Sequence, residues 1–278
     1  MKLILGTAQL VQPYGVLGNS YGPREGAAPS ILKAAVVGGF SALDTAPIYG
    51  DAEATIGSID HGLGLHTKIR HGSDSVESVK QSLAALATSR LDVVYLHQEY
   101  TGSAHQLDSL QHLSDHMGAK INSLGASLYS LEELYRVLES PLLTSVQIPL
   151  NVLDRRFTNE VLSLAKQEGI TVYARSIFLQ GLLLAAASAL PANLLSLAPF
   201  IQQFHAVAAR HGLTPLEATL GFAKSFGSLD GLVVGAHSAE NVGEISRAFF
   251  QDYSQEFVEE CFGIKTPPGH LTDPRNWM

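Results

Sequence analysis

Polar residues able to take part in catalysis stand at the ends of three successive apolar runs. Asp44 ends the first of these runs, Lys68 the second and His97 the third. Tyr49 follows Asp44 by five residues, in the adjoining segment. If the runs are neighbouring strands of one parallel barrel, their carboxyl ends lie at the same rim. We therefore expect the four side chains to converge there.

This combination of side chains suits proton transfer to a carbonyl oxygen. A phenol is a weak acid at neutral pH, but an ammonium a few ångströms away favours the phenolate, so Lys68 would tune Tyr49. The Asp44 carboxylate would keep the lysine charged and oriented, and the His97 imidazole could donate to a substrate oxygen. No side chain transfers hydride, so Tyr49 would act together with a bound redox cofactor.

Each of these residues also has a simpler interpretation when it is considered alone. Lys68 could be an ion-paired lysine, His97 a core histidine with its hydrogen bonds satisfied, and Asp44 the cap of an Asp-Thr-Ala-Pro turn. However, a titratable side chain ends each of three successive apolar runs. This coincidence favours one shared catalytic site as much as three separate structural roles.

The elements that would position these residues are eight short apolar runs. Most of the runs are continuously apolar, which is typical of strands buried on both faces of a parallel sheet. The segments between them are amphipathic, and helix starts are marked at Asp74, Ser130 and Thr214 by a capping residue followed by an acid three positions later. The runs cover residues 3–6, 41–44, 65–68, 91–97, 121–127, 146–149, 170–174 and 232–235.

This alternation of strand and helix predicts an α/β protein with one (β/α)₈ TIM barrel over residues 1–278. No linker rich in proline, serine or glycine divides the chain. An open, doubly wound sheet is the alternative. For the tail, residues 263–278, two interpretations stand: a cover over the active site, or a loosely packed terminus.

Composition excludes several classes of protein. Of the 278 residues, 46% are hydrophobic and only 16% are charged, and the net charge is −8. These values disfavour disorder and a nucleic-acid-binding surface, and the single Cys261 excludes an internal disulfide framework. The first ten residues do not resemble a secretory signal, and the most apolar stretch, residues 177–199, is interrupted before it could span a bilayer. We expect a cytoplasmic protein that binds a small molecule, with no nucleic-acid or membrane partner.

The segment that surrounds Tyr49 resembles the signature of the aldo-keto reductase superfamily. It reads Leu-Asp-Thr-Ala-Pro-Ile-Tyr-Gly over residues 43–50 and is followed by Glu53 and Gly57. The order Asp44, Tyr49, Lys68, His97 also matches the catalytic tetrad of that superfamily. Further matching stretches are residues 6–8, 96–97, 125–127, Gln147, 175–182 and 234–238. The resemblance implies NAD(P)H-dependent reduction of an aldehyde or ketone to the alcohol, or the reverse oxidation.

The same resemblance implies where the cofactor binds. Ser127 and Gln147 would hold the nicotinamide amide, the loop from residue 175 to 181 would wrap the pyrophosphate, and the adenosine would rest near the eighth strand. Ser238 is placed to open a helix, and backbone N–H groups at a helix start can bind phosphate. The implied cofactor-binding residues are Gly6, Thr7, Ser127, Gln147, Arg175, Ser176, Phe178, Gln180, Gly181, Gly235, Ser238, Asn241 and Glu244.

Two positions depart from the family pattern. Leu128 stands where many members carry asparagine, which removes one implied contact to the nicotinamide amide. Residues 235–245 contain no lysine or arginine, whereas members that prefer NADP(H) often place a basic residue there. We expect NADP(H) first, because the family favours it, with NAD(H) close behind.

The substrate and other possible activities are less sharply defined. The loop from residue 11 to 29 and the residues Gln98, Glu99 and Tyr100 are candidates to wall the pocket, and a polar mouth would suit a sugar or hydroxy-aldehyde.

Two other functions remain as alternatives to carbonyl reduction. They are a non-catalytic nicotinamide-binding sensor subunit and a Schiff-base aldolase that uses Lys68. Solvent-facing positions explain His105, His112 and His116 more simply than a metal site does, so we predict no metal.

Overall fold

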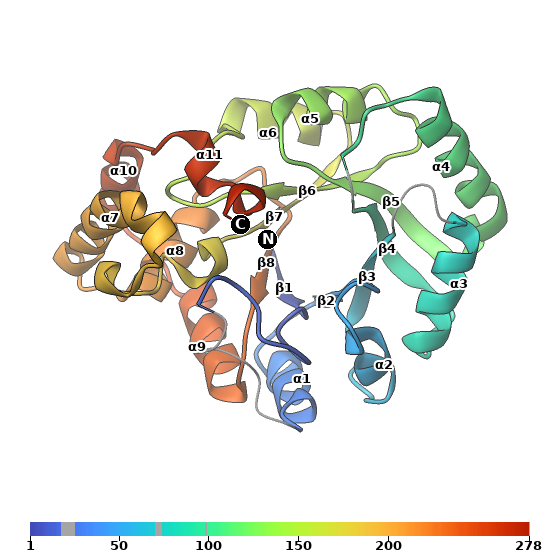
Figure 1. Cartoon of the computed structure of the whole chain (residues 1–278), viewed down its shortest axis with the longest axis horizontal. Coiled ribbons are helices and arrows are strands. Elements are labelled where there is room, and N and C mark those ends of the chain that lie inside the picture. Colours follow the sequence, from blue (N-terminus) through green and yellow to red (C-terminus); the bar gives the residue numbers. More distant parts are fainter. Residues whose placement is uncertain (18–25, 70–73, 98, 278) are drawn as a thin grey trace.

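Eight parallel strands close into one barrel in the order in which they occur along the chain (Figure 1). The computed structural model describes residues 1–17, 26–69, 74–97 and 99–277. The predicted single-domain (β/α)₈ barrel is thereby confirmed, and the open sheet is excluded. The strands are β1 (Lys2–Gly6), β2 (Ala42–Asp44), β3 (Gly64–Ile69), β4 (Leu91–Leu96), β5 (Ile121–Ser127), β6 (Ser145–Pro149), β7 (Thr171–Arg175) and β8 (Gly231–Gly235).

Helices alternate with the strands and surround them (Figure 1). Full capping boxes start two of them at Ser130 and Thr214, and the Asp74 side chain accepts a hydrogen bond from the Glu77 N–H at a third, as the sequence predicts. No helix in the described ranges has the length and apolar character that crossing a bilayer requires. The helices are α1 (Ala28–Val37), α2 (Ala52–Gly57), α3 (Ser75–Ala85), α4 (Ala104–Met117), α5 (Leu131–Leu138), α6 (Asn159–Gln167), α7 (Ala198–Arg210), α8 (Pro215–Lys224), α9 (Ala239–Phe250), α10 (Gln255–Gly263) and α11 (Gly269–Thr272).

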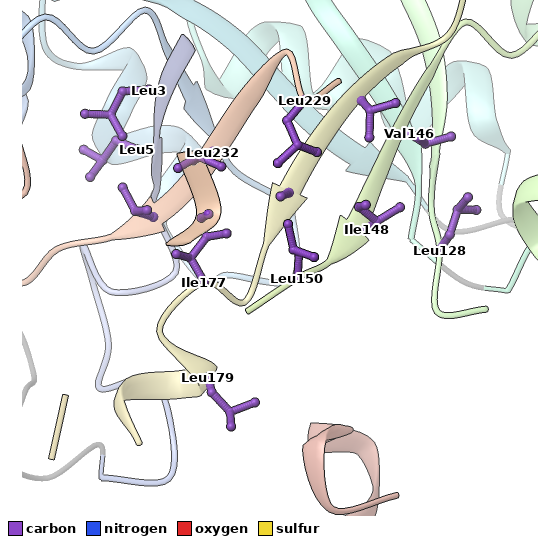
Figure 2. Close-up of a cluster of buried hydrophobic side chains, with 14 of the residues drawn as sticks. Leu3, Leu5, Leu128, Val146, Ile148, Leu150, Ile177, Leu179, Leu229 and Leu232 are labelled. Atoms are coloured by element: carbon purple, nitrogen blue, oxygen red, sulfur yellow. The ribbon is translucent and has the colours of Figure 1, made fainter. Parts of the chain in front are cut away.

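The main core lies between the barrel and the ring of helices. Successive residues of a strand point to opposite sides of the sheet, so Leu3 and Leu5 join the outer core while Ile4 belongs to a separate cluster inside the barrel. Figure 2 shows part of the outer core, with side chains from β1, β6 and β8. Because most strand residues are buried on both faces of the sheet, most of the strand sequences are largely apolar.

The barrel interior contains a buried histidine, two residues before Lys68 on β3. His66 on β3 is 4% exposed, and its ring centroid lies 6.0 Å from that of Tyr95 and 5.1 Å from that of Tyr173. Burial lowers the pKa of His66 to about 4, although the nearby carboxylates Asp44 and Asp92 act in the opposite direction. His66 is therefore neutral in the folded protein at neutral pH.

His66 is expected to make the protein less stable as the pH falls from about 6.5 to 4. Over that range the unfolded chain protonates this imidazole and the folded chain does not, so unfolding takes up a proton. The loss should reach about 3 kcal/mol near pH 4. Urea unfolding at several pH values measures it. The variant His66→Phe should lose this share of the pH dependence, whereas His270→Gln, at an exposed position, is the control for loss of an imidazole.

Candidate active site

The four predicted catalytic side chains line one cavity at the carboxyl ends of the strands. Asp44 is the last residue of β2, Lys68 lies near the end of β3 and His97 directly follows β4. Tyr49 lies in the turn between β2 and α2. The cavity has a volume of about 470 Å³ and includes all four residues in its lining. The structure therefore brings together the groups that the sequence places on separate strands.

A buried ion pair forms the floor of this cavity. Lys68 and Asp44 are 3% and 4% exposed, and the Lys68 ammonium donates to Asp44 Oδ1 and, at 3.0 Å, to the Thr45 carbonyl. Gln147 Nε2 donates to the other oxygen of Asp44. Burial alone would lower the pKa of Lys68, but the Asp44 carboxylate and then Tyr49 outweigh it, and the pKa is raised. Lys68 is therefore a fixed cation in this site.

Tyr49 is held above this cation by its turn. The Tyr49 N–H donates to the Ala46 carbonyl at 2.9 Å, which brings the side chain back over the end of the barrel. Lys68 Nζ lies 5.1 Å from the centre of the Tyr49 ring and shares a hydrogen bond with its hydroxyl. The His97 ring meets the Tyr49 ring edge-on, with 6.3 Å between centroids. A phenol, an ammonium and an imidazole thus converge on one space, which is an arrangement suited to protonating a substrate oxygen.

Ser127 on β5 and Gln147 on β6 provide further polar groups in the lining of the cavity. Ser127 ends β5 and accepts a hydrogen bond from Arg175 Nε at 3.2 Å. Gln147 on β6 is fully buried, and its Oε1 has no hydrogen-bond partner within the described part of the chain. A buried carbonyl oxygen without a partner is costly, so this atom suits an N–H group of a bound ligand.

The loop after β7 has an unusual backbone. Ser176, Leu179 and Gln180 have φ angles of 59°, 48° and 54°, in the left-handed region that residues other than glycine seldom occupy. Such strain gathers at ligand-binding segments. The loop after β1 lies against this one, since a Cβ added at Gly15 would come within 2.8 Å of the Gln180 carbonyl oxygen. Two loops therefore meet at one side of the cavity.

The far end of the cavity lies at the start of α9. Asn241 and Glu244 line it, together with residues at the start of α8. Ser238 caps α9, since its Oγ accepts from the Asn241 N–H at 3.1 Å. Among the described lining residues, the only lysine and arginine are Lys68 and Arg175, both at the strand ends.

Nearly all the predicted cofactor-binding residues face this cavity, but Ser238 does not. It is absent from the described lining, and its side chain caps α9. Glu99 and Tyr100 also lie elsewhere, and Tyr100 is 1% exposed in the outer core. Gln98 lies outside the described residues. The predicted residues that line the cavity are Gly6, Thr7, Ser127, Gln147, Arg175, Ser176, Phe178, Gln180, Gly181, Gly235, Asn241 and Glu244.

Several lining residues were missed by the sequence. Tyr14 lies in the loop that we expected to wall the pocket, and Tyr129 comes just after β5, where the barrel rule could have found it. Ile177 likewise lies in the loop that we expected to wrap the pyrophosphate, and Ala8, Val234 and His237 lie in stretches that resemble the family signature. The lining residues that the sequence analysis did not single out are Ala8, Gln9, Tyr129, Leu184, Thr214, Pro215, Leu216, Val233, Val234 and His237.

The chain's tail touches one wall of the cavity from outside. The Arg275 guanidinium stacks at 3.7 Å on the Tyr129 ring, which lines the cavity, and pairs with the Asp273 carboxylate at 2.6 Å. Trp277 is 8% exposed and donates from its indole to the Leu271 carbonyl. Within the described residues, nothing beyond residue 263 lines the cavity itself.

The histidines of α4 form a pair. The His112 and His116 rings are 4.1 Å apart, and His116 Nδ1 lies 2.8 Å from the His112 carbonyl. In the ranges that the structure describes, no three metal-binding side chains gather at one point.

Comparison with known proteins points to one family. A family model described as "Aldo/keto reductase family" matches residues 2–265. The chain is 26% identical to the oxidoreductase sirO of Leptosphaeria maculans, over 88% of each protein. It is also 26% identical to the aldo-keto reductase YhdN of Bacillus subtilis, in an alignment that covers 55% of this chain and only 52% of that relative.

Solved structures show the same fold. The holo form of the aldo-keto reductase AKR11C1 from Bacillus halodurans superposes with a TM-score of 0.75 at 19% identity, over 95% of this chain and 91% of that one. The glycerol dehydrogenase AKR11B4 from Gluconobacter oxydans has a TM-score of 0.72 at 21% identity, over 94% and 90%.

Proposed function

This chain belongs to the aldo/keto reductase family, and on that premise we propose that it is an NAD(P)H-dependent oxidoreductase that converts an aldehyde or ketone to the alcohol, or the reverse, with Tyr49 as the proton donor and acceptor. The observation that carries the proposal is the arrangement of Tyr49 and His97 over the buried Lys68–Asp44 pair, inside a cavity that also reaches the start of α9.

The residues present fit a nicotinamide dinucleotide. The cavity extends from Tyr49 and His97 to Asn241 and Glu244, and its volume lies in the usual range of cofactor sites. Ser127 and Gln147 Oε1, which accepts no hydrogen bond from the described residues, would hold the carboxamide, and the strained loop from residue 176 to 181 would hold the pyrophosphate. When it is bound, the reduced cofactor supplies the hydride.

The chain's own residues then handle the proton. His97 and Tyr49 polarise the carbonyl by hydrogen bonding to its oxygen, and Tyr49 passes its proton to that oxygen as the carbonyl carbon receives hydride. The Lys68 ammonium stabilises the negative charge left on Tyr49, and Asp44 keeps Lys68 charged and oriented. A solvent proton restores Tyr49. One carbonyl, one hydride and one proton give one alcohol.

The aldolase alternative conflicts with the state of Lys68. A Schiff-base lysine must attack as the neutral amine. Here the Asp44 carboxylate holds the ammonium in a buried ion pair, and the pKa of Lys68 is raised. The site therefore supports electrostatic use of this lysine rather than nucleophilic use.

A binding and turnover experiment tests the proposed function. Each reduced cofactor is titrated into the protein, and aliphatic, aromatic and hydroxy aldehydes are then screened by loss of dihydronicotinamide absorbance. We expect binding and turnover with at least one carbonyl class. Tight cofactor binding with no turnover on any carbonyl or alcohol would support the sensor alternative, and no binding of either cofactor would contradict both.

Discrimination between NADP(H) and NAD(H) is expected to be small. A 2′-phosphate at the adenosine end would meet Asn241, His237 and Glu244 but no lysine or arginine among the described lining residues. A charge-assisted hydrogen bond contributes roughly 1.5–3 kcal/mol, so without one the two reduced cofactors should differ in Kd by no more than about tenfold. Calorimetric titration measures both constants. A preference for NADPH well above a hundredfold would contradict this prediction.

A further inference from the structure

We propose that Arg175 makes this site distinguish the redox state of its cofactor, so that the oxidised nicotinamide binds more weakly than the reduced one. The inference rests on the proposed function and extends it to one residue at the end of β7. The physical basis is simple, because the reduced nicotinamide ring is neutral and the oxidised ring is a cation. A fixed positive charge beside the ring repels only the oxidised form.

The guanidinium of Arg175 is held by neutral acceptors. Its Nε donates to Ser127 Oγ at 3.2 Å, Nη1 to Ser176 Oγ at 3.2 Å and Nη2 to the Leu128 carbonyl at 3.1 Å. The group also stacks on the Tyr129 ring at 4.2 Å. These contacts leave the charge well fixed, and none of them neutralises it.

Neighbouring arginines are paired with carboxylates, whereas Arg175 has no such partner among the described residues. Arg156 forks onto Asp154 at 2.8 and 2.9 Å, and Arg275 pairs with Asp273. Across residues 1–17, 26–69, 74–97 and 99–277, no carboxylate forms an ion pair with Arg175.

The other charges of the cavity do not offset this one. The Asp44 carboxylate is already neutralised by Lys68, and Glu244 lies at the α9 end of the cavity. The Arg175 charge acts to lower the pKa of Asp154, but the Asp154 carboxylate forms its ion pair with Arg156. The strand-end half of the described lining therefore carries an excess of one positive charge.

This charge lies next to the expected position of the nicotinamide. Arg175 is half-buried, lines the cavity and contacts the same Ser127 hydroxyl that is proposed to hold the carboxamide. A ligand group that hydrogen-bonds with Ser127 Oγ would therefore share this oxygen with Arg175 Nε, which places it close to the guanidinium. At such separations in a partly buried site, the Coulomb energy of two unit charges corresponds to a factor of about 10 to 100 in affinity.

The consequence concerns both directions of the reaction. A bound reduced cofactor would supply the hydride and would then carry a positive charge on its ring, near which Arg175 would hold its own charge. The fixed charge therefore speeds departure of the oxidised cofactor after carbonyl reduction, and it makes the bound oxidised ring a stronger hydride acceptor from an alcohol. We therefore expect the oxidised cofactor to inhibit carbonyl reduction less strongly in the unaltered protein than in a variant that lacks the Arg175 charge.

Dissociation constants test the proposal without any substrate. Calorimetric titrations with NADH, NAD⁺, NADPH and NADP⁺ are made on the unaltered protein and on three variants. Arg175→Gln removes the charge and keeps a polar side chain, and Arg175→Lys keeps the charge without the planar fork. Arg275→Gln is the matched control, because it removes a guanidinium from the other face of Tyr129 that is already paired with Asp273.

The unaltered protein should bind each reduced cofactor at least about tenfold more tightly than its oxidised form. Arg175→Gln should lower that ratio about tenfold, mainly by strengthening the binding of the oxidised form, while Arg175→Lys and Arg275→Gln should keep the ratio close to that of the unaltered protein. Equal affinity for both redox forms in the unaltered protein, or an unchanged ratio in Arg175→Gln, overturns the inference.

Two further results separate this inference from the proposed function. If no cofactor binds the unaltered protein, the proposed function fails. If Arg175→Gln binds neither form, ADP-ribose, which lacks the nicotinamide, serves as the reference on the unaltered protein. The inference then predicts that the oxidised cofactor binds no more tightly than ADP-ribose, whereas the reduced cofactor binds more tightly than ADP-ribose. If both redox forms bind more tightly than ADP-ribose by the same factor, the inference is overturned.

Discussion

Replacing Tyr49 with phenylalanine is expected to lower kcat for carbonyl reduction by about three orders of magnitude, because a positioned general acid typically contributes 10²–10⁴-fold. The ring would remain in the turn beside His97, but the hydroxyl that hydrogen-bonds with Lys68 would be gone. Cofactor affinity should change little, since the cofactor is proposed to be held by Ser127, Gln147 and the loop after β7. Steady-state kinetics and cofactor titration on the same preparation measure both quantities.

Tyr129→Phe is the matched control for this experiment. It removes a phenolic hydroxyl from the same cavity and keeps the ring on which Arg175 stacks. Its turnover should stay near that of the unaltered protein. Comparable turnover by Tyr49→Phe and Tyr129→Phe would show that the Tyr49 hydroxyl is not the proton donor.

Replacing Lys68 with methionine is expected to reduce both stability and activity. The substitution leaves the Asp44 carboxylate buried without its cation, and breaking a buried pair in this way costs about 3–5 kcal/mol. Turnover should also fall by orders of magnitude, because no charge remains to stabilise the deprotonated Tyr49. Urea unfolding at neutral pH measures the first effect and steady-state kinetics the second.

A double variant separates the two effects of Lys68. In Lys68→Met with Asp44→Asn, the uncompensated carboxylate becomes a neutral amide, so most of the lost stability should return. Turnover should stay low, since the cation is still missing. Recovery of turnover together with stability would mean that Lys68 acts only as a structural group.

The strands could be predicted because the barrel imposes a strong pattern on the sequence. Both faces of each strand are buried, so the apolar runs end within about two residues of the strands themselves. The run predicted from residue 170 to 174 is shifted by one, and Arg175 is the last residue of β7 rather than the first of its loop. Since the barrel rule places reactive groups at strand ends, the convergence of Asp44, Lys68 and His97 followed from the same pattern.

Residues that reach the cavity through tertiary packing could not be predicted in this way. Thr214, Pro215 and Leu216 start α8, in the long connection between β7 and β8, and nothing local in the sequence brings them to the barrel mouth. Ser238 shows the opposite case. Its position in the sequence suits both a helix cap and a phosphate contact, and the structure shows its hydroxyl engaged in the cap.

The sequence also contained no indication that Arg175 lacks a carboxylate partner within the part of the chain that the structure describes. Asp154 is close enough for the Arg175 charge to act on its pKa, but its carboxylate is hydrogen-bonded to Arg156. Which arginine pairs with Asp154 depends on how the segments that follow β5, β6 and β7 pack together in the folded barrel. Only the assembled rim shows that one guanidinium is left with neutral partners.

In the proposed reaction, hydride reaches the carbonyl carbon of a substrate held by Tyr49 and His97. The most direct test of this step uses reduced cofactor carrying two deuterium atoms at the ring carbon that donates hydride, with a carbonyl substrate found in the screen. Mass spectrometry of the product should show one deuterium on the former carbonyl carbon, with the unaltered protein and not with Tyr49→Phe over the same time. Oxidation of the labelled cofactor that yields no deuterated alcohol would contradict hydride transfer to the carbonyl carbon.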